Sequence, residues 1–151
     1  MPMFRSSDLR RGRYSACGHV YLLTSVTHMR KPIFTDWRVG RLLVSEFRKA
    51  HEARVVHSMA WVVMPDHFRW LVELRRGTLG LIMRHVKSGS ALTLVRSGLV
   101  HSRVWQKGYY DRALRKEDDL RSVARYIVAN PLRAGLVSRV GDYPLWDAVW
   151  L

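Results

Sequence analysis

The order of apolar and polar positions along the chain predicts strands and helices in alternation. Residues 19–27 are rich in β-branched and aromatic side chains, which is typical of a strand. After Asp36, which can cap a helix, apolar residues recur at helical spacing, and Gly40 is an unfavourable residue within that helix. The apolar stripe consists of Val39, Leu42, Leu43, Phe47 and Ala50.

The middle of the chain predicts a β-hairpin followed by a second helix. Strands are expected over residues 55–63 and 68–74, with the turn-forming sequence Met-Pro-Asp at 64–66 between them. The second helix begins near Thr78, and the Ser-Gly-Ser sequence at 88–90 is a candidate break or bend in it. Its apolar face consists of Leu79, Ile82, Met83 and Val86.

The last third of the chain predicts two short strands and a further helix. The strands are expected near Val104 and over residues 109–114. Three acidic residues at 117–119 crowd the first turn of the helix, where negative charge complements the helix dipole, and Pro131 ends it. The buried face of this helix consists of Leu120, Val123, Ala124, Ile127 and Val128.

The order β-α-β-β-α-β followed by a helix is that of a ferredoxin-like sandwich. We therefore predict an α+β fold in which an antiparallel sheet has helices on one face, plus a C-terminal helix that carries Tyr126. A chain of 151 residues is too short for two cores of ordinary size, so we expect a single domain. Its expected parts are a basic leader (1–17), a core (18–137) and a C-terminal tail (138–151).

Composition adds a strong expectation about the partner. The chain has 26 Lys and Arg against 12 Asp and Glu, a net charge of +14, which favours a polyanion and above all nucleic acid. No stretch approaches the roughly 18 apolar residues of a membrane span, so a membrane partner is not expected. The start has no apolar run of the kind a secretory signal needs, and the lone Cys17 suits a reducing compartment, so we expect a cytoplasmic protein.

The positive charge is unevenly distributed. Residues 75–116 contain ten Lys or Arg and one acid, Asp111, which indicates a surface that faces DNA, although a charge run can also be a solvated face. A second basic cluster lies in the leader, where it is either a flexible arm that reaches DNA or an untethered tail. The leader residues in question are Arg10, Arg11 and Arg13.

Two groups of residues are candidates for chemistry. Tyr126 lies away from the centre of the apolar arc of the last helix, and Asn130 follows about 40° round on the same side, so both could meet one reactant. The alternative is a tyrosine at the edge of a core and an asparagine that caps the chain before proline. In the hairpin, His67 and Arg69 point to one face of a strand and Phe68 to the other. A lone histidine is more often structural.

Three segments, in this order, closely resemble the REP-associated tyrosine transposases, relatives of the single-tyrosine HUH transposases of simple insertion sequences. They are WVVMPDH at 61–67, VWQKGYYDRALR at 104–115 and YIVANPLRAGLV at 126–137. The likeness extends over about residues 19–137, which is most of the chain.

The resemblance implies a ferredoxin-like nuclease that cuts single-stranded DNA beside a hairpin and keeps one end covalently on tyrosine. By position, Tyr126 would be the nucleophile, His67 the first metal ligand, and Asn130 a third ligand or metal-site partner. Imidazole, amide oxygen and water suit Mg²⁺ or Mn²⁺, and a divalent ion would assist a weakly nucleophilic phenol.

One residue departs from the family pattern of two histidines separated by a bulky apolar residue. The second histidine is replaced by Arg69, which cannot ligate a metal and places a positive charge beside the expected cation. We expect metal binding to be weak or lost and cleavage to be reduced. Two alternatives are that Arg69 binds the phosphate and partly replaces the metal, or that the residue was introduced to trap an inactive complex.

The expected partner is single-stranded or hairpin DNA, with no small-molecule substrate, bound by a monomer or weak dimer. A non-catalytic module that binds DNA hairpins through the same fold is the alternative, and RNA binding is disfavoured because no paired aromatic motif of the RNA-binding type is visible. The residues expected to contact DNA are Arg10, Arg11, Arg13, Arg84, Lys87, Lys107, Arg112, Arg115 and Arg133.

Overall fold

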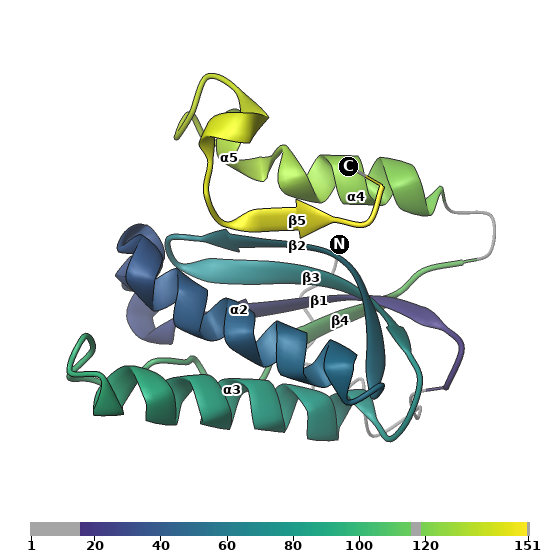
Figure 1. The fold of residues 1–151 in the computed structure, drawn as a ribbon, viewed down its shortest axis with the longest axis horizontal. Coiled ribbons are helices and arrows are strands. Elements are labelled where there is room, and N and C mark those ends of the chain that lie inside the picture. The colour runs from purple at the N-terminus through teal and green to yellow at the C-terminus, as the bar shows by residue number, and fades with distance from the viewer. Residues whose placement is uncertain (1–15, 116–118, 151) are drawn as a thin grey trace.

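A five-stranded antiparallel sheet forms the centre of the protein (Figure 1). The computed structural model describes residues 16–115 and 119–150. The strand order is β4-β1-β3-β2-β5, in which the first four strands have the order of a ferredoxin-like sheet and the fifth is added at the β2 edge. The strands are β1 (Val20–Val26), β2 (Val56–Met64), β3 (His67–Leu74), β4 (Tyr110–Ala113) and β5 (Trp146–Ala148).

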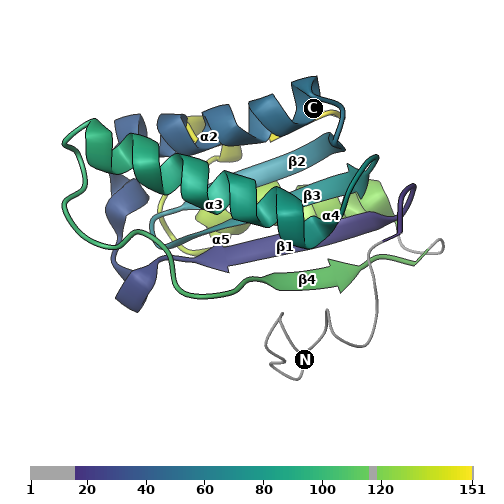
Figure 2. The same ribbon diagram turned by 90° about the horizontal axis from the view of Figure 1, so that it is seen from below.

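The helices lie on both faces of this sheet. Helices α2 and α3 lie side by side over one face, as Figure 2 shows, and α4 packs on the opposite face against β2 and β5. The predicted α+β fold is therefore confirmed. None of the helices in the described residues is long and apolar enough to cross a membrane. The helices are α2 (Trp37–Glu52), α3 (Leu79–Arg96), α4 (Leu120–Val128) and α5 (Asn130–Arg133), with 3₁₀ turns at His28–Arg30, Ile33–Thr35 and Val140–Asp142.

Each long helix begins at a side-chain cap. The Asp36 carboxylate accepts a hydrogen bond from the backbone amide of Arg38, which confirms the predicted start of α2. Thr78 caps α3 in the same way through its hydroxyl. In α4 the cap is Asp119, which accepts hydrogen bonds from two backbone amides and so precedes the first turn instead of lying in it. The other two acids of that cluster lie outside the described residues.

Strict alternation along β3 separates two hydrophobic clusters. Phe68 and Trp70 are fully buried under α2 and α3, in the larger cluster. His67, Arg69 and Leu71 point to the other face, where Leu71 joins a smaller cluster with residues of α4. The polar residues of the hairpin are therefore on the face that α4 covers in part.

Two expectations for the region between α3 and β4 are wrong. Helix α3 continues through residues 88–90 without a break, because Gly89 lies against the Glu46 side chain of α2 and Ser90 is buried with its hydroxyl bonded to the Lys87 carbonyl. The strand expected near Val104 is only an isolated bridge between Thr27 and Trp105. Packing of α3 against α2 and the sheet outweighs the local preference of these residues.

The end of the chain also differs from expectation. Helix α4 ends at Val128, before the proline, and Pro131 lies in the short helix α5 that follows. Since proline has no amide hydrogen, it cannot donate to the carbonyl of Ile127, and the helical ladder is interrupted there. The tail then returns to the sheet as β5, and Leu145 fills the space over Gly40, where a Cβ would collide with it.

Candidate active site

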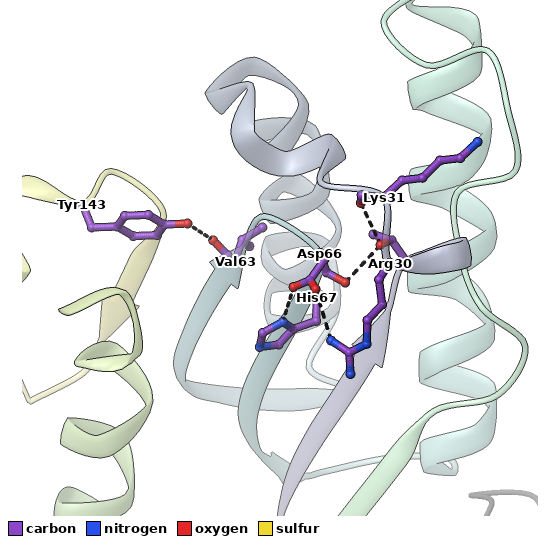
Figure 3. A network of polar contacts seen from close by, with 7 residues as sticks. Arg30, Lys31, Val63, Asp66, His67 and Tyr143 are labelled. Carbon is purple, nitrogen blue, oxygen red and sulfur yellow. Dashed lines mark hydrogen bonds and ion pairs between the residues drawn. The ribbon is translucent and has the colours of Figure 1, made fainter. Parts of the chain in front are cut away.

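The turn between β2 and β3 is fixed by backbone hydrogen bonds from two other segments. The Thr27 amide donates to the Asp66 carbonyl at 2.9 Å, and the Thr27 hydroxyl lies between the carbonyls of Lys31, at 2.8 Å, and Asp66, at 3.1 Å. The Phe34 amide donates to the Pro65 carbonyl at 3.0 Å. The turn therefore presents Asp66 and His67 in a defined position, as Figure 3 shows.

His67 is held by the carboxylate that precedes it. The ring Nδ1 lies 2.8 Å from Asp66 Oδ1, and because a carboxylate can only accept, Nδ1 carries the proton and Nε2 keeps its lone pair. Arg30 donates to the second oxygen, Oδ2, at 3.1 Å, from a turn whose backbone is left-handed at φ 51° (Figure 3). This chain of contacts fixes the ring and directs a nitrogen acceptor away from Asp66.

Burial and charge both keep the imidazole neutral. Burial lowers the pKa of His67 below its ordinary value of 6.5, and the positive charges of Arg69 and Arg30 lower it further, against the opposing effect of Asp66. Burial raises the pKa of Asp66, but the hydrogen bonds from His67 and Arg30 outweigh burial and leave that pKa below 3.8. At neutral pH the pair is therefore a neutral histidine beside a carboxylate.

Arg69 lies two residues further along the same face of β3. Its cross-strand neighbours are Thr24 on β1 and Val62 on β2, and Thr24 in turn pairs with Tyr110 on β4. The guanidinium Nε is buried without a hydrogen-bond partner, and no carboxylate pairs with Arg69 among the described residues. The Nε of Arg69 is therefore a buried donor without an acceptor in the described part of this structure.

Tyr126 is on the exposed side of α4. Its side chain is 58% exposed, whereas Ala124, Ile127 and Val128 bury the opposite side of the helix against β2. The Arg133 guanidinium lies over the tyrosine ring, 3.6 Å from its centroid. The phenol is therefore open to a large substrate and has a cation at its ring face.

Tyr126 and His67 lie on the same side of the sheet. Leu71, which shares the face of His67, packs in one cluster with Ile127 of α4, and Met64, opposite His67 in the hairpin, belongs to that cluster too. Helix α5, which follows α4, contacts β2 and lies at the end of the sheet where the β2–β3 turn is found (Figure 1). The two groups are thus neither on opposite faces nor sealed from solvent.

Asn130 is the first residue of α5, directly after the helix that carries Tyr126. Ala129, between the two helices, keeps a right-handed helical conformation (φ −82°, ψ −1°). The i to i+4 relation between Tyr126 and Asn130 therefore stays a prediction. Asn130 is half-buried.

The described donors do not suit a tightly bound divalent ion. No group of three or more His, Cys, Asp or Glu side chains in the described part of the chain is arranged to hold a metal. His67 offers one imidazole nitrogen, but the adjacent position on the face is the cation Arg69. An imidazole beside an unpaired guanidinium is a better match for a phosphate oxygen than for Mg²⁺ or Mn²⁺.

The predicted DNA-contacting residues fall into three places. Arg84, Lys87 and Lys107 line one groove between α3 and the segment that precedes β4, on the face opposite Tyr126. Arg112 and Arg115 are exposed on or just after the edge strand β4, and Arg133 is on α5 beside Tyr126. The leader arginines 10, 11 and 13 lie outside the described residues.

Sequence reasoning missed three contributors to these places. Asp66 orients His67, and its position directly before the histidine was the available signal. Arg30 completes that network from a segment with no recognisable motif. Arg103 lines the groove with the predicted cations, and its place in the basic stretch 75–116 was the available signal.

Sequence comparisons find transposases among the known proteins that this chain is similar to. The family model described as "Transposase IS200 like" matches residues 15–130. A Haemophilus influenzae protein assigned as a REP-associated tyrosine transposase is 27% identical over 143 residues, which cover 84% of this chain and 78% of that protein. The REP-associated tyrosine transposase of Escherichia coli K12 is 32% identical over 114 residues, which cover 71% of this chain and 67% of that protein.

A solved structure gives the same result. The structure of a REP-associated tyrosine transposase bound to a REP hairpin superimposes with a TM-score of 0.73 at 25% identity, over 97% of this chain and 82% of that one. The chain therefore belongs to the IS200-like transposase family and, within it, to the REP-associated tyrosine transposases.

Proposed function

We propose that this transposase binds palindromic repeat hairpins and cleaves and rejoins an adjacent single strand through a covalent 5′-phosphotyrosine on Tyr126. The observation that carries the proposal is the exposed phenol of Tyr126 on the same side of the sheet as His67 and Arg69. The solved relative bound to a REP hairpin supports the choice of DNA, and the net charge of +14 suits it.

The proposed reaction is a transesterification. The Tyr126 oxygen forms a bond to phosphorus, and the bond from phosphorus to the 3′ oxygen of the upstream fragment breaks. The upstream fragment leaves with a 3′ hydroxyl, while the downstream fragment stays on the enzyme through its 5′ phosphate. The phenol loses a proton and the leaving oxygen gains one. His67 has a free Nε2 lone pair on this face and is the group we assign to proton transfer. The reverse reaction with a different 3′ hydroxyl joins the strands.

Arg69 has a separate role in this proposal. Its unpaired guanidinium is assigned to the non-bridging oxygens of the scissile phosphate, where it neutralises part of the developing charge. A single positive charge supplies less stabilisation than a divalent ion. We therefore expect slow cleavage, with binding of Mg²⁺ or Mn²⁺ weak or lost.

The test is formation of a covalent adduct. Hairpin DNA with single-stranded flanks, labelled at its 3′ end, is incubated with the full chain in Mg²⁺ or Mn²⁺ and separated on a denaturing gel. We expect a slowly formed adduct that is absent in Tyr126→Phe and present in Tyr110→Phe, a control tyrosine on the same side of the sheet. An adduct that survives Tyr126→Phe contradicts the assignment of the nucleophile.

The second variant addresses Arg69. Arg69→His restores an imidazole two residues after His67, and we expect adduct formation to rise by about tenfold or more, equivalent to about 1.4 kcal/mol of the barrier. Unchanged adduct formation would show that the metal site of the family is not centred on these two positions.

A non-catalytic hairpin-binding module is the second candidate, and the unpaired guanidinium at position 69 is the observation that favours it. Tight hairpin binding without any adduct, in the parent chain and in Arg69→His, would support this module over the enzyme.

A further inference from the structure

A groove of about 590 Å³ lies between α3 and the segment 102–109. The aromatic residues at its base, Trp105 and Tyr109, belong to the hydrophobic cluster under α2 and α3, so the groove is on the face of the sheet opposite Tyr126. Figure 2 shows the segment running beside α3 before it enters β4. A volume in the roughly 300–1,000 Å³ range of ligand clefts suits a few nucleotides rather than a duplex.

The wall opposite α3 is held in place by hydrogen bonds. The indole nitrogen of Trp105 donates to the Ser90 hydroxyl at 3.0 Å, inside the protein. The Lys87 ammonium donates to the carbonyl of Gln106 at 2.9 Å and to the carbonyl of Gly108. Lys87 thus forms hydrogen bonds within the protein and positions the segment that forms this wall. The groove is preformed, which lowers the entropy cost of binding a strand.

Among the described residues, those that line the groove include cations and no carboxylates. Arg84 projects from α3, and Arg103 and Lys107 project from the opposite wall. Arg103 uses its Nε to donate to the Trp105 carbonyl at 3.0 Å, which orients the guanidinium and leaves its terminal nitrogens for another acceptor. All fifteen described residues that line the groove are non-acidic, so the local charge selects a polyanion.

We propose that this groove binds the phosphodiester backbone of a single-stranded flank of the DNA, on the side of the sheet opposite the nucleophile. The inference rests on the proposed function because the ligand is the flank of the same hairpin. The rim cations contact phosphates, and the apolar floor accommodates sugar and base without sequence readout.

The edge strand β4 links this groove to the face of Tyr126. β4 follows directly from the groove wall and is the outermost strand on its side of the sheet. Arg112 is exposed on β4 and pairs with Leu22 of β1, which places it on the α4 side. Lys107 and Arg112 therefore place positive charge on both sides of the sheet edge at β4. A single DNA strand that passes this edge would reach both the groove and the face of Tyr126.

The test compares two DNAs and two double variants. Binding of a blunt hairpin and of the same hairpin with single-stranded flanks is measured by fluorescence anisotropy at several salt concentrations. We expect Arg84→Gln with Lys107→Gln to weaken binding of the flanked hairpin by about tenfold and to leave the blunt hairpin unchanged. The salt dependence should fall by about 1.4 in log–log slope, since each phosphate contact on a single strand contributes about 0.7.

The matched control removes the same charge elsewhere. Arg41→Gln with Arg48→Gln changes two exposed arginines of α2 that do not line the groove, and should affect both DNAs equally and weakly. If the groove variant behaves like this control, or if flanks add no affinity to the parent chain, the groove proposal is wrong and hairpin binding still stands. If the parent chain binds neither DNA, the proposed function fails and the groove proposal fails with it.

Discussion

The two faces of the central sheet are built on the same strands but differ in how completely they are covered. On the face under α2 and α3, Phe68 and Trp70 have no exposed surface, and Phe47 of α2 stacks on Trp70 at 4.6 Å between ring centroids. On the other face, α4 contacts β2 and β5 and does not reach β1 or β4 through its main contacts. The half-buried residues left there include Thr24 and Arg69.

This difference explains how one small sheet provides both stability and a site. Long helices of 16 and 18 residues cover one face, whereas the nine residues of α4 cover only part of the other. Because side chains alternate along a strand, β3 can place aromatic rings in the core and polar groups in the partly covered face with no change in backbone. The complete face stabilises the fold, and the incomplete face leaves His67 and Arg69 only half-buried.

The largest expected effect is on stability, at the covered face. Trp70→Ala should lower the free energy of unfolding by about 3–5 kcal/mol, since it leaves a cavity beside Phe47 and removes the hydrogen bond from the indole to Ser58 at 2.9 Å. Tyr126→Ala, at an exposed side chain, should change it by less than about 1 kcal/mol. Urea denaturation measures both, and similar losses would contradict the contrast between the faces.

The regular part of this contrast was predictable from the sequence. The apolar stripes of α2 and α3 and the alternation through Phe68 and Trp70 follow helical and strand periodicity directly, so the buried face could be anticipated. Tyr126 was also recognisable as lying away from the apolar arc of its helix, and it is exposed. Such predictions need only the periodicity of apolar residues within one helix or strand, because the apolar side of each element packs into the core.

The remainder depends on contacts between distant segments. The sequence Ser-Gly-Ser at 88–90 favours a break, but Trp105 bonds the buried Ser90 and α3 continues. The three-residue strand β5 is too short for a periodic signal and forms only because β2 has a free edge. The contact of Arg30 with Asp66 joins positions 36 residues apart, which no local pattern specifies.

A smaller effect of the opposite sign is expected at Arg69. Arg69→Met should raise the free energy of unfolding by about 1 kcal/mol, because a buried unsatisfied donor costs about 1–3 kcal/mol and methionine fills a similar volume. The same variant should weaken DNA binding. Arg112→Met, at an exposed position on the same side of the sheet, is the control and should give no gain in stability. A loss of stability in Arg69→Met would show that the guanidinium is satisfied in solution.

The partly covered face should also show a dependence on pH. Burial depresses the pKa of His67, so its neutral form is favoured in the folded state. The stability that this provides is complete above the unfolded value of 6.5 and is lost as pH falls from there through the folded pKa. Asp66 also has a lowered pKa, and its contribution is lost at more acidic pH, below about its ordinary value of 3.8.

His67→Gln isolates the first of these two windows. Stability of the variant should stay flat where that of the parent chain declines just below pH 6.5, and its decline in the acidic window of Asp66 should be smaller, because it lacks the His67 hydrogen bond that helps to lower the pKa of Asp66. Denaturation curves at closely spaced pH values test this expectation. A parent chain whose stability increases on acidification through 6 would mean that His67 is charged in the folded state.

The smallest expected effect concerns the tail, which packs against both hydrophobic clusters through Tyr143. Its hydroxyl donates to the Val63 carbonyl at 2.6 Å (Figure 3), and Tyr143→Phe should cost about 0.5–1 kcal/mol at neutral pH. Burial raises the pKa of Tyr143 to about 12, so its stabilisation is complete below the ordinary value of 10 and declines as pH rises from 10 towards 12. The advantage of the parent chain over Tyr143→Phe should narrow over that interval in urea denaturation. A constant difference would mean that the phenol is solvated, and that the tail does not join the two faces at this edge.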